Sequence, residues 1–275
     1  MFDKSSPFTT PTKNPSSQIQ LKDFAFKLLY GAILSCELWP GDYVSEAEFA
    51  SRFGLSKTPV RDALTRLAAI GFVQTEQRRG WQISPLTGRS IGEVIELRRQ
   101  LEPALISKSI DAQCVDDLSK LASILAATAG ADATTTDATR YLCDRDFMNR
   151  LAAVNGNQLM SRWLVELWDR TERIQRFVTR CTEQFPPLPD RMAIVDALEE
   201  GDMEAAKAAL LKPVDEFEFF ATRALLQFNV NLGGIVREHA ADTKRAKKTR
   251  KRKGNPALGK KASDAQRGSL KSGSS

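Results

Sequence analysis

The stretch "FGLSKTPVRDALTRLAAIGFV", residues 53–73, constrains the fold of this chain more than any other. Three residues, "GLS", separate two apolar helical patterns, and a turn this short forces the two helices to cross closely. Val60, Leu64 and Leu67 repeat at the spacing of one helix face. Pro59 falls in the first turn, where a missing N–H costs little. The stretch therefore predicts a helix-turn-helix.

The flanking residues complete a small domain. An apolar stripe predicts a first helix over about residues 17–35, formed by Leu21, Ala25, Leu28, Leu29, Ala32 and Ile33. Ser45 and Glu48 have the spacing of a capping box at the start of "EAEFASRF", and Ser56 is placed to cap the next helix. "FVQTE" and "GWQIS" are strand-like runs around "QRRG", which predicts a hairpin. Residues 17–85 are therefore expected to form a winged helix-turn-helix.

The second helix of such a pair reads base edges in the DNA major groove with its N-terminal residues. Here that end carries Ser56, Lys57, Thr58 and Arg61. Arg61 is long enough to pair with a guanine, and Arg66, further along, is expected to contact the DNA backbone. The predicted wing tip adds Arg78, Arg79 and Gly80. A basic helix start alone is more often a solvated face, but its coincidence with a tight turn and a basic hairpin favours DNA binding.

The charge of the chain is unevenly distributed. Residues 237–275 hold thirteen Lys and Arg against three acids, so the net charge of +6 comes from this tail and the rest of the chain is acidic. Residues 51–80 are a local exception, with six bases and two acids. We expect residues 1–16 and the tail, 237–275, to be disordered, and the tail to bind polyanions without sequence preference.

The motifs of this sequence resemble those of a known protein family. "PGDYVSEAEFASRFGLSKTPVRDALTRLAAIGFV", followed by "RRGWQIS", is similar to the DNA-binding domain of GntR-type bacterial transcription regulators. "VIELRRQLEPALISKSI", "DRDFMNRLAAVNGNQLM" and "IVDALEEGDMEAAKAAL" resemble the effector domain (FCD type) of the FadR-like branch. The resemblance covers about residues 17–230.

The resemblance implies a mainly α protein, with the winged helix followed by an all-α bundle over residues 86–236 that binds an effector and dimerises. Apolar stripes agree with helices near 90–110, 114–128, 138–154, 157–181, 190–200 and 202–231. The implied function is an effector-responsive transcription regulator of a metabolic or catabolic operon, expected to be a repressor. It would bind a palindromic operator in double-stranded DNA as a homodimer.

The effector domain departs from its family at one site. Many relatives hold a divalent metal there with one Asp and three His, and the matching positions here are Asp144, Met148, Arg191 and Pro213. A carboxylate with a thioether is a poor metal site, so we expect no metal and no cofactor. Arg191 either pairs with Asp144 or grips a small organic acid effector, with Arg98 assisting.

Other functions are less well supported by the residues. The chain has one histidine and no nucleophile–base constellation, which argues against an enzyme. Four widely spaced cysteines, no apolar leader and no membrane-length apolar run lead us to expect a cytoplasmic protein with reduced thiols. A redox sensor is the minor alternative for the thiols. The alternative for the whole chain is an architectural DNA-binding protein that acts through its basic tail.

Overall fold

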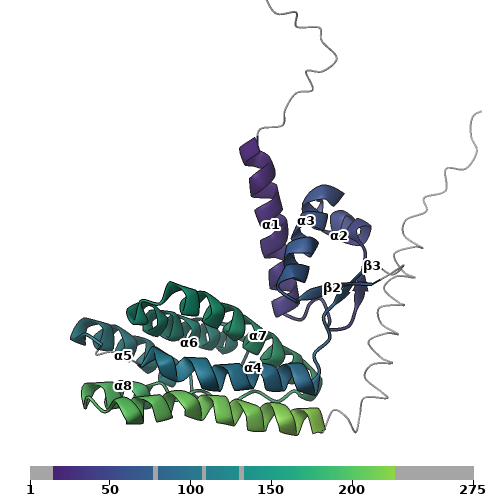
Figure 1. Cartoon of the computed structure of the whole chain (residues 1–275). Coiled ribbons are helices and arrows are strands. Elements are labelled where there is room, and N and C mark those ends of the chain that lie inside the picture. The colour runs from purple at the N-terminus through teal and green to yellow at the C-terminus, as the bar shows by residue number, and fades with distance from the viewer. Residues whose placement is uncertain (1–14, 77–79, 107–109, 130–132, 227–275) are drawn as a thin grey trace, which may run out of the picture. The chain divides into compact units, whose positions relative to one another are not determined.

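The computed structural model of the protein describes residues 15–76, 80–106, 110–129 and 133–226. Most of these residues are helical, and the strands are confined to residues 43–83 (Figure 1). The expectation of a mainly α fold, with a winged helix-turn-helix ahead of a helical domain, is confirmed. Most of the segments expected to be disordered, 1–16 and 237–275, lie outside the described residues.

Three helices and three short strands form the N-terminal part. In chain order they are α1 (Pro15–Leu34), β1 (Tyr43–Val44), α2 (Glu46–Phe53), α3 (Lys57–Ala69), β2 (Val73–Glu76) and β3 (Gly80–Ile83). Gly54 ends α2 with a left-handed φ of 64°, and residues 54–56 form the predicted turn into α3. Because this φ is costly for residues with a Cβ, glycine makes the sharp turn possible.

Of the two helix caps predicted from the sequence, the structure contains one. The capping box of α2 is confirmed, since the Glu48 N–H donates to the Ser45 hydroxyl at 3.1 Å and the Glu48 carboxylate accepts from the Ser45 N–H at 3.2 Å. Ser56 occupies the N-cap position of α3 with an extended backbone, but its hydroxyl makes no capping hydrogen bond. The prediction that the Ser56 side chain caps α3 was therefore wrong. That hydroxyl is left exposed at the surface.

The strands form one antiparallel sheet in the order β1–β3–β2. Val73 pairs with Ile83 and Glu76 with Gly80 across the predicted hairpin, while Tyr43 and Val44 of β1 pair with Gln82 and Trp81 of β3. β1 is too short to be predicted from the sequence, because two residues do not show the alternation by which a strand is recognised.

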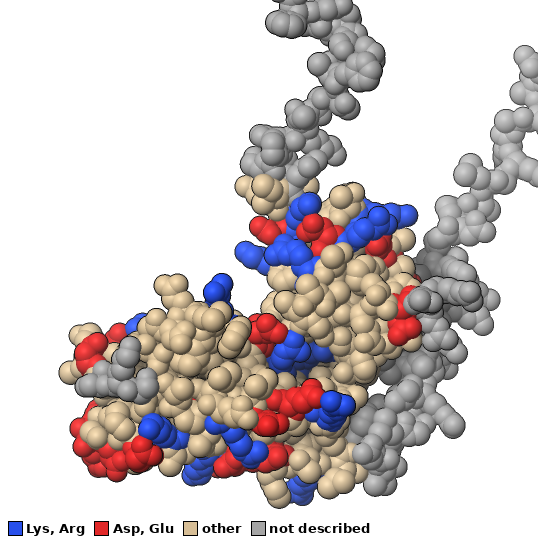
Figure 2. All heavy atoms as spheres, viewed as in Figure 1, with Lys and Arg blue, Asp and Glu red and all other residues tan. Residues whose placement is uncertain are grey.

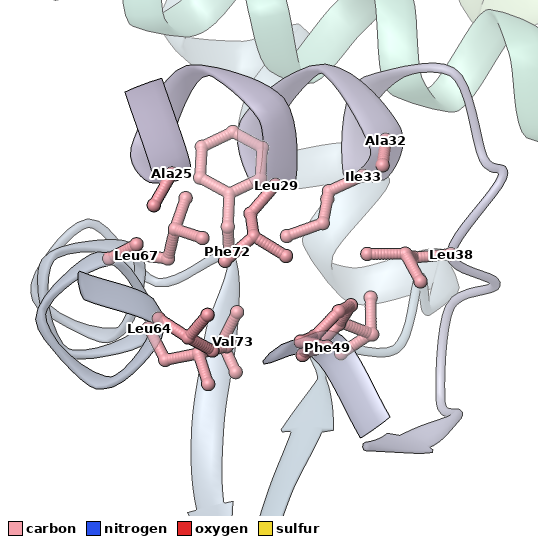
Figure 3. Packing of buried hydrophobic residues seen from close by; sticks show 13 residues of the cluster. Ala25, Leu29, Ala32, Ile33, Leu38, Phe49, Leu64, Leu67, Phe72 and Val73 are labelled. Carbon is pink, nitrogen blue, oxygen red and sulfur yellow. The ribbon is translucent and has the colours of Figure 1, made fainter. Parts of the chain in front are cut away.

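The core of the winged helix joins α1 to α2, α3 and the sheet (Figure 3). Leu29 and Ile33 of α1 pack with Leu64 and Leu67 of α3, and all four side chains are almost completely buried. The predicted stripe of α1 holds at Ala25, Leu29, Ala32 and Ile33, whereas Leu28 is only partly buried and Leu21 is exposed. Leu21 lies near the start of α1, ahead of the first buried position of the cluster, Ala25, so little packs over it.

The second part of the chain is entirely helical where it is described. Its helices are α4 (Gly88–Leu101), the short 3₁₀ helix η1 (Glu102–Leu105), α5 (Ala112–Ala127), α6 (Ala133–Asn155), α7 (Gln158–Thr182), α8 (Met192–Glu199) and a last helix over residues 203–226. In Figure 1 the longer helices lie side by side as a bundle, and α5 packs on both α6 and α8.

Two predicted boundaries in the bundle were wrong. The helix expected over 90–110 changes to 3₁₀ geometry at Glu102, because Pro103 lacks an N–H for the α-helical ladder. Residues 133–137, expected in a loop, belong to α6. Extending an existing helix costs far less than starting one, so α6 can include this threonine-rich segment.

Across these described helices, none combines the length and apolar composition needed to cross a membrane.

Candidate DNA-binding surface and ligand pocket

The N-terminal turn of α3 separates a buried face from an exposed one. Pro59 and Val60 point into the core, whereas Ser56, Lys57 and Thr58 are exposed. The helix N-terminus also carries a partial positive charge from its unpaired N–H groups. This end of α3 therefore offers donors and positive charge to an anionic partner.

Arg61 lies one turn further along α3 and is held by Glu46 of α2. Its Nε and Nη2 atoms each lie 2.8 Å from a Glu46 carboxylate oxygen, and its side chain stays 68% exposed. The hydrogen bonds from Arg61 lower the pKa of Glu46 below its ordinary value, so Glu46 stays charged at neutral pH. The Trp81 indole N–H also donates to Glu46, at 3.4 Å. Glu46 thus fixes the direction of a guanidinium that solvent, or DNA, can still reach.

Arg66 is placed differently from Arg61. Its Nη1 atom lies 2.9 Å from Asp23 of α1, and its guanidinium carbon lies 4.1 Å from the centre of the Phe26 ring. These contacts join α3 to α1. Arg66 keeps a partly exposed side chain at the same surface, which is compatible with the predicted backbone contact and does not test it.

The charged side chains of the winged helix are interleaved rather than segregated (Figure 2). Basic residues of α1 and α2 pair with acids of the same domain, as in Lys22 with Asp62 and Arg52 with Glu37. Gly80 begins β3 with a φ of 90°, and a Cβ there would lie 3.1 Å from the Val44 carbonyl. Arg78 and Arg79 of the predicted wing tip lie outside the described residues.

In the bundle, the predicted pair of Arg191 and Asp144 is present. The Arg191 Nε atom donates to an Asp144 carboxylate oxygen at 2.6 Å, joining the start of α8 to α6. The Arg191 side chain is 2% exposed, and its Nη1 atom is buried without a hydrogen-bond partner. Since buried guanidinium N–H groups are normally paired, this atom is a vacant donor.

A small cavity of about 50 Å³ brings all four predicted effector residues together: Arg98, Asp144, Met148 and Arg191. Arg98 is buried and bonded to Glu102, with its Nε atom 2.6 Å from a carboxylate oxygen. The Trp168 indole N–H donates to the same Glu102 oxygen at 3.0 Å. The charge of Arg98 is therefore balanced by Glu102. Of the four residues, Arg191 is the one with a buried N–H donor that lacks a hydrogen-bond partner.

The residues at this cavity do not fit a divalent metal. The Arg191 guanidinium occupies the carboxylate that a metal would need, and Met148 is a buried thioether. Within the described part of the chain, no three His, Cys, Asp or Glu side chains gather as metal ligands would. A fixed positive charge at this position would repel a cation, whereas it would attract an organic anion.

Several residues in or beside the cavity were not predicted from the sequence. Glu102 lies four residues after Arg98, a spacing that predicts an ion pair on one helix face and could have identified it. Glu102 binds Arg98 without lining the cavity itself, whereas Tyr141, Arg145 and Glu172 line it directly. Nothing in their spacing indicates this, because α6 and α7 meet only through tertiary packing.

One side of α7 contacts the winged helix through three arginines. Their guanidinium groups donate to main-chain carbonyls at the ends of secondary elements: Arg170 to Ile70, Arg173 to Ser84 and Arg180 to Cys36. Other residues of α7, including Trp168 and Glu172, line the small cavity. The same helix therefore contacts both the cavity and the winged helix.

The cysteines described here are all free thiols. Burial raises the pKa of Cys36, and burial raises the pKa of Cys181 to about 12. Both groups are therefore protonated at neutral pH. Because the thiolate is the reactive form, neither residue has the character of a redox sensor.

Comparison with known proteins agrees with this architecture. Residues 21–83 match the family described as bacterial regulatory proteins, gntR family, and residues 93–215 match the FCD domain. The solved structure of E. coli McbR/YncC superposes with a TM-score of 0.59 over 76% of this chain and 98% of that chain, at 19% identity. At this identity the likeness shows the fold.

Curated relatives are similar over shorter stretches. The HTH-type transcriptional regulator YdhC of Bacillus subtilis is 30% identical over 82 residues, which is 30% of this chain and 37% of that protein. The probable D-xylose utilization operon transcriptional repressor of Paenarthrobacter nicotinovorans is 27% identical over 62% of this chain and 75% of that protein. The chain thus spans well under two thirds of YdhC. With both domain matches in their expected order, the chain carries a DNA-binding domain of the gntR family of bacterial regulatory proteins, followed by an FCD domain.

Proposed function

We propose that the protein is a transcription regulator that binds a palindromic operator as a homodimer and releases it when a small organic acid binds the bundle. The observation that carries this proposal is the exposed, basic start of α3. There Ser56, Lys57, Thr58 and Arg61 project from a helix whose opposite face is buried in the winged helix-turn-helix. A helix presented in this way fits the major groove.

Repression of a metabolic or catabolic operon is the proposed mode of regulation. One relative carries the name of a repressor of a D-xylose utilization operon, which supports this mode for the present chain. A repressor needs a signal that lowers its affinity for DNA. The bundle cavity beside Arg191 supplies a place for that signal.

The proposed effector group is a carboxylate bound by Arg191. Its Nη1 donor has no partner, and a guanidinium matches the two oxygens of a carboxylate. Asp144 competes for the same guanidinium, so ligand binding would replace one carboxylate by another. Such an exchange moves α6 and α8 relative to each other without burying an additional charge.

An exposed apolar face on α4 and α7 is the proposed dimer interface. Leu97 is 46% exposed and Trp163 is 57% exposed, and both line a groove of about 450 Å³ with Val94, Leu101 and Leu167. A large exposed aromatic in an apolar groove is typical of protein–protein interfaces. Because a twofold interface uses the same patch on both subunits, a second copy of this face is a complementary partner.

Selection of bound sequences from a random duplex DNA library tests the function directly. We expect the full chain to enrich an inverted repeat, and footprinting on that repeat to show one short protected region per dimer. Uniform coating without an enriched sequence would instead support the alternative, an architectural DNA-binding protein acting through its basic tail.

A further inference from the structure

The small cavity at Arg191 opens beside a much larger one. The larger cavity has a volume of about 710 Å³ and shares Tyr141, Asp144, Glu172 and Gln175 with the smaller. The smaller, of about 50 Å³, holds only a few water-sized groups, which is the size of a carboxylate. We call the smaller the head chamber and the larger the vestibule. A ligand whose carboxylate reaches Arg191 must place the rest of its body in the vestibule.

The vestibule has an apolar wall. Leu125 and Ala129 of α5 contribute one part, and the segment between α7 and α8 contributes the other with Phe185, Pro186, Pro187, Leu188 and Pro189. Proline side chains have no donor, and their fixed φ makes the segment stiff before any ligand binds. Such a wall favours an apolar body over a hydroxylated one, because buried hydroxyl groups need partners.

The charged side chains of the vestibule are already engaged. Arg176 pairs with Glu172 at 2.8 Å, Arg180 donates to the Cys36 carbonyl at 2.8 Å, and Arg140 donates to Thr128. A second carboxylate on the ligand would have to break one of these contacts. An apolar body would leave them intact, so Arg191 remains the donor best placed for the ligand's charge.

From these observations we infer that the effector is an apolar monocarboxylate, with its carboxylate in the head chamber at Arg191 and its hydrocarbon body against Leu188 in the vestibule. This inference rests on the proposed role of Arg191 and adds the chemical class of the ligand. It also places the body beside Arg180, whose other contact is the winged helix.

Binding of a homologous series to the full-length protein tests the ligand class. The probes are straight-chain monocarboxylates from acetate to decanoate, measured by isothermal titration calorimetry. Each methylene buried in an apolar site strengthens binding by about fourfold, so we expect affinity to rise steadily with chain length until the vestibule is filled. Suberate, the dicarboxylate with the same carbon count as octanoate, should bind more weakly than octanoate.

Substitutions in the vestibule locate the body of the ligand. Leu188→Asp should weaken octanoate binding by tenfold or more and leave propionate binding unchanged. The matched control is Leu142→Asp, which places the same charge at a 59% exposed position of α6 that lines neither chamber. Leu188→Ala, a milder change, should weaken octanoate binding severalfold, which keeps the test decisive if the aspartate variant fails to fold.

The outcomes separate this inference from the function on which it rests. Equal affinity for all chain lengths, or tighter binding of suberate than of octanoate, would overturn the apolar class while leaving a carboxylate site at Arg191. Absence of binding by every carboxylate would overturn both the apolar ligand class and the carboxylate site at Arg191. An enriched inverted repeat in the DNA selection would still identify a regulator in either case.

Discussion

The Tyr30 hydroxyl of α1 donates a 2.6 Å hydrogen bond to Asp169 of α7, and the same carboxylate pairs with Arg145. Arg145 lines the head chamber, so three side chains connect the ligand pocket to the first helix of the winged helix. Burial and the bond to Asp169 raise the pKa of Tyr30 far above its ordinary value. Tyr30 therefore remains a hydrogen-bond donor throughout the physiological pH range.

Tyr30→Phe should reduce the coupling between ligand and DNA. Removing a hydrogen bond to a charged group costs about 1.5–3 kcal/mol of unfolding free energy when the site is shielded from water, and less here because Tyr30 is only partly buried. We expect a smaller ratio of operator affinities without and with bound carboxylate, and a lower urea midpoint. An unchanged affinity ratio would show that the Tyr30–Asp169 bond is only structural.

Arg61→Ala should remove discrimination at one base pair in each half-site. A bidentate arginine–guanine pair accounts for about tenfold to hundredfold preference for guanine over another base. The Arg61 side chain is exposed and can therefore make such a contact. The measurement compares operator variants at each position by gel shift. Arg150→Ala, an exposed arginine of α6 that also pairs with an acid, should change nothing. Equal weakening on specific and random DNA would contradict a base-reading role.

Glu46→Gln should produce a milder form of the Arg61 phenotype. The Glu46 carboxylate orients Arg61 through two hydrogen bonds, and an amide can accept only one of them. We expect a partial loss of preference at the same base pair and a nearly unchanged affinity for random DNA. If the affected base pair differs from that of Arg61→Ala, Glu46 does not act through Arg61.

Arg191→Ala should weaken carboxylate binding by at least tenfold while preserving operator binding without ligand. Asp144→Asn removes the competing carboxylate but keeps the guanidinium, so it should bind the ligand at least as tightly as the unaltered protein. Elemental analysis of untagged protein should find no stoichiometric transition metal. A ligand response that survives in Arg191→Ala would reduce Arg191 to a structural partner of Asp144.

Trp163→Glu should convert the proposed dimer to monomers at micromolar concentration. Large aromatics at interface centres contribute about 2 kcal/mol or more, so the dissociation constant should rise by about thirtyfold or more. Analytical ultracentrifugation measures the change, and Leu142→Glu on exposed α6 is the control. An unchanged sedimentation coefficient would exclude the α4–α7 face as the interface.

The local features of the fold were predictable from the sequence. The α2 capping box, the turn at Gly54 and the buried stripe of Val60, Leu64 and Leu67 depend on residues close together in the chain. Their geometry follows from capping, backbone conformation and helical periodicity. The resemblance to GntR regulators rests on the same local motifs, and it led to the four head-chamber residues.

Only the tertiary structure decided which charges are available. Arg61, Arg66, Arg98 and Arg191 are the same residue type in the sequence, but their partners come from packing. Glu46 holds Arg61 at the surface, whereas burial leaves one Arg191 donor without a partner. The vestibule likewise combines α5, α6, α7 and the segment before α8. Such relationships depend on how helices far apart in the chain pack together, and local sequence patterns carry no record of that packing.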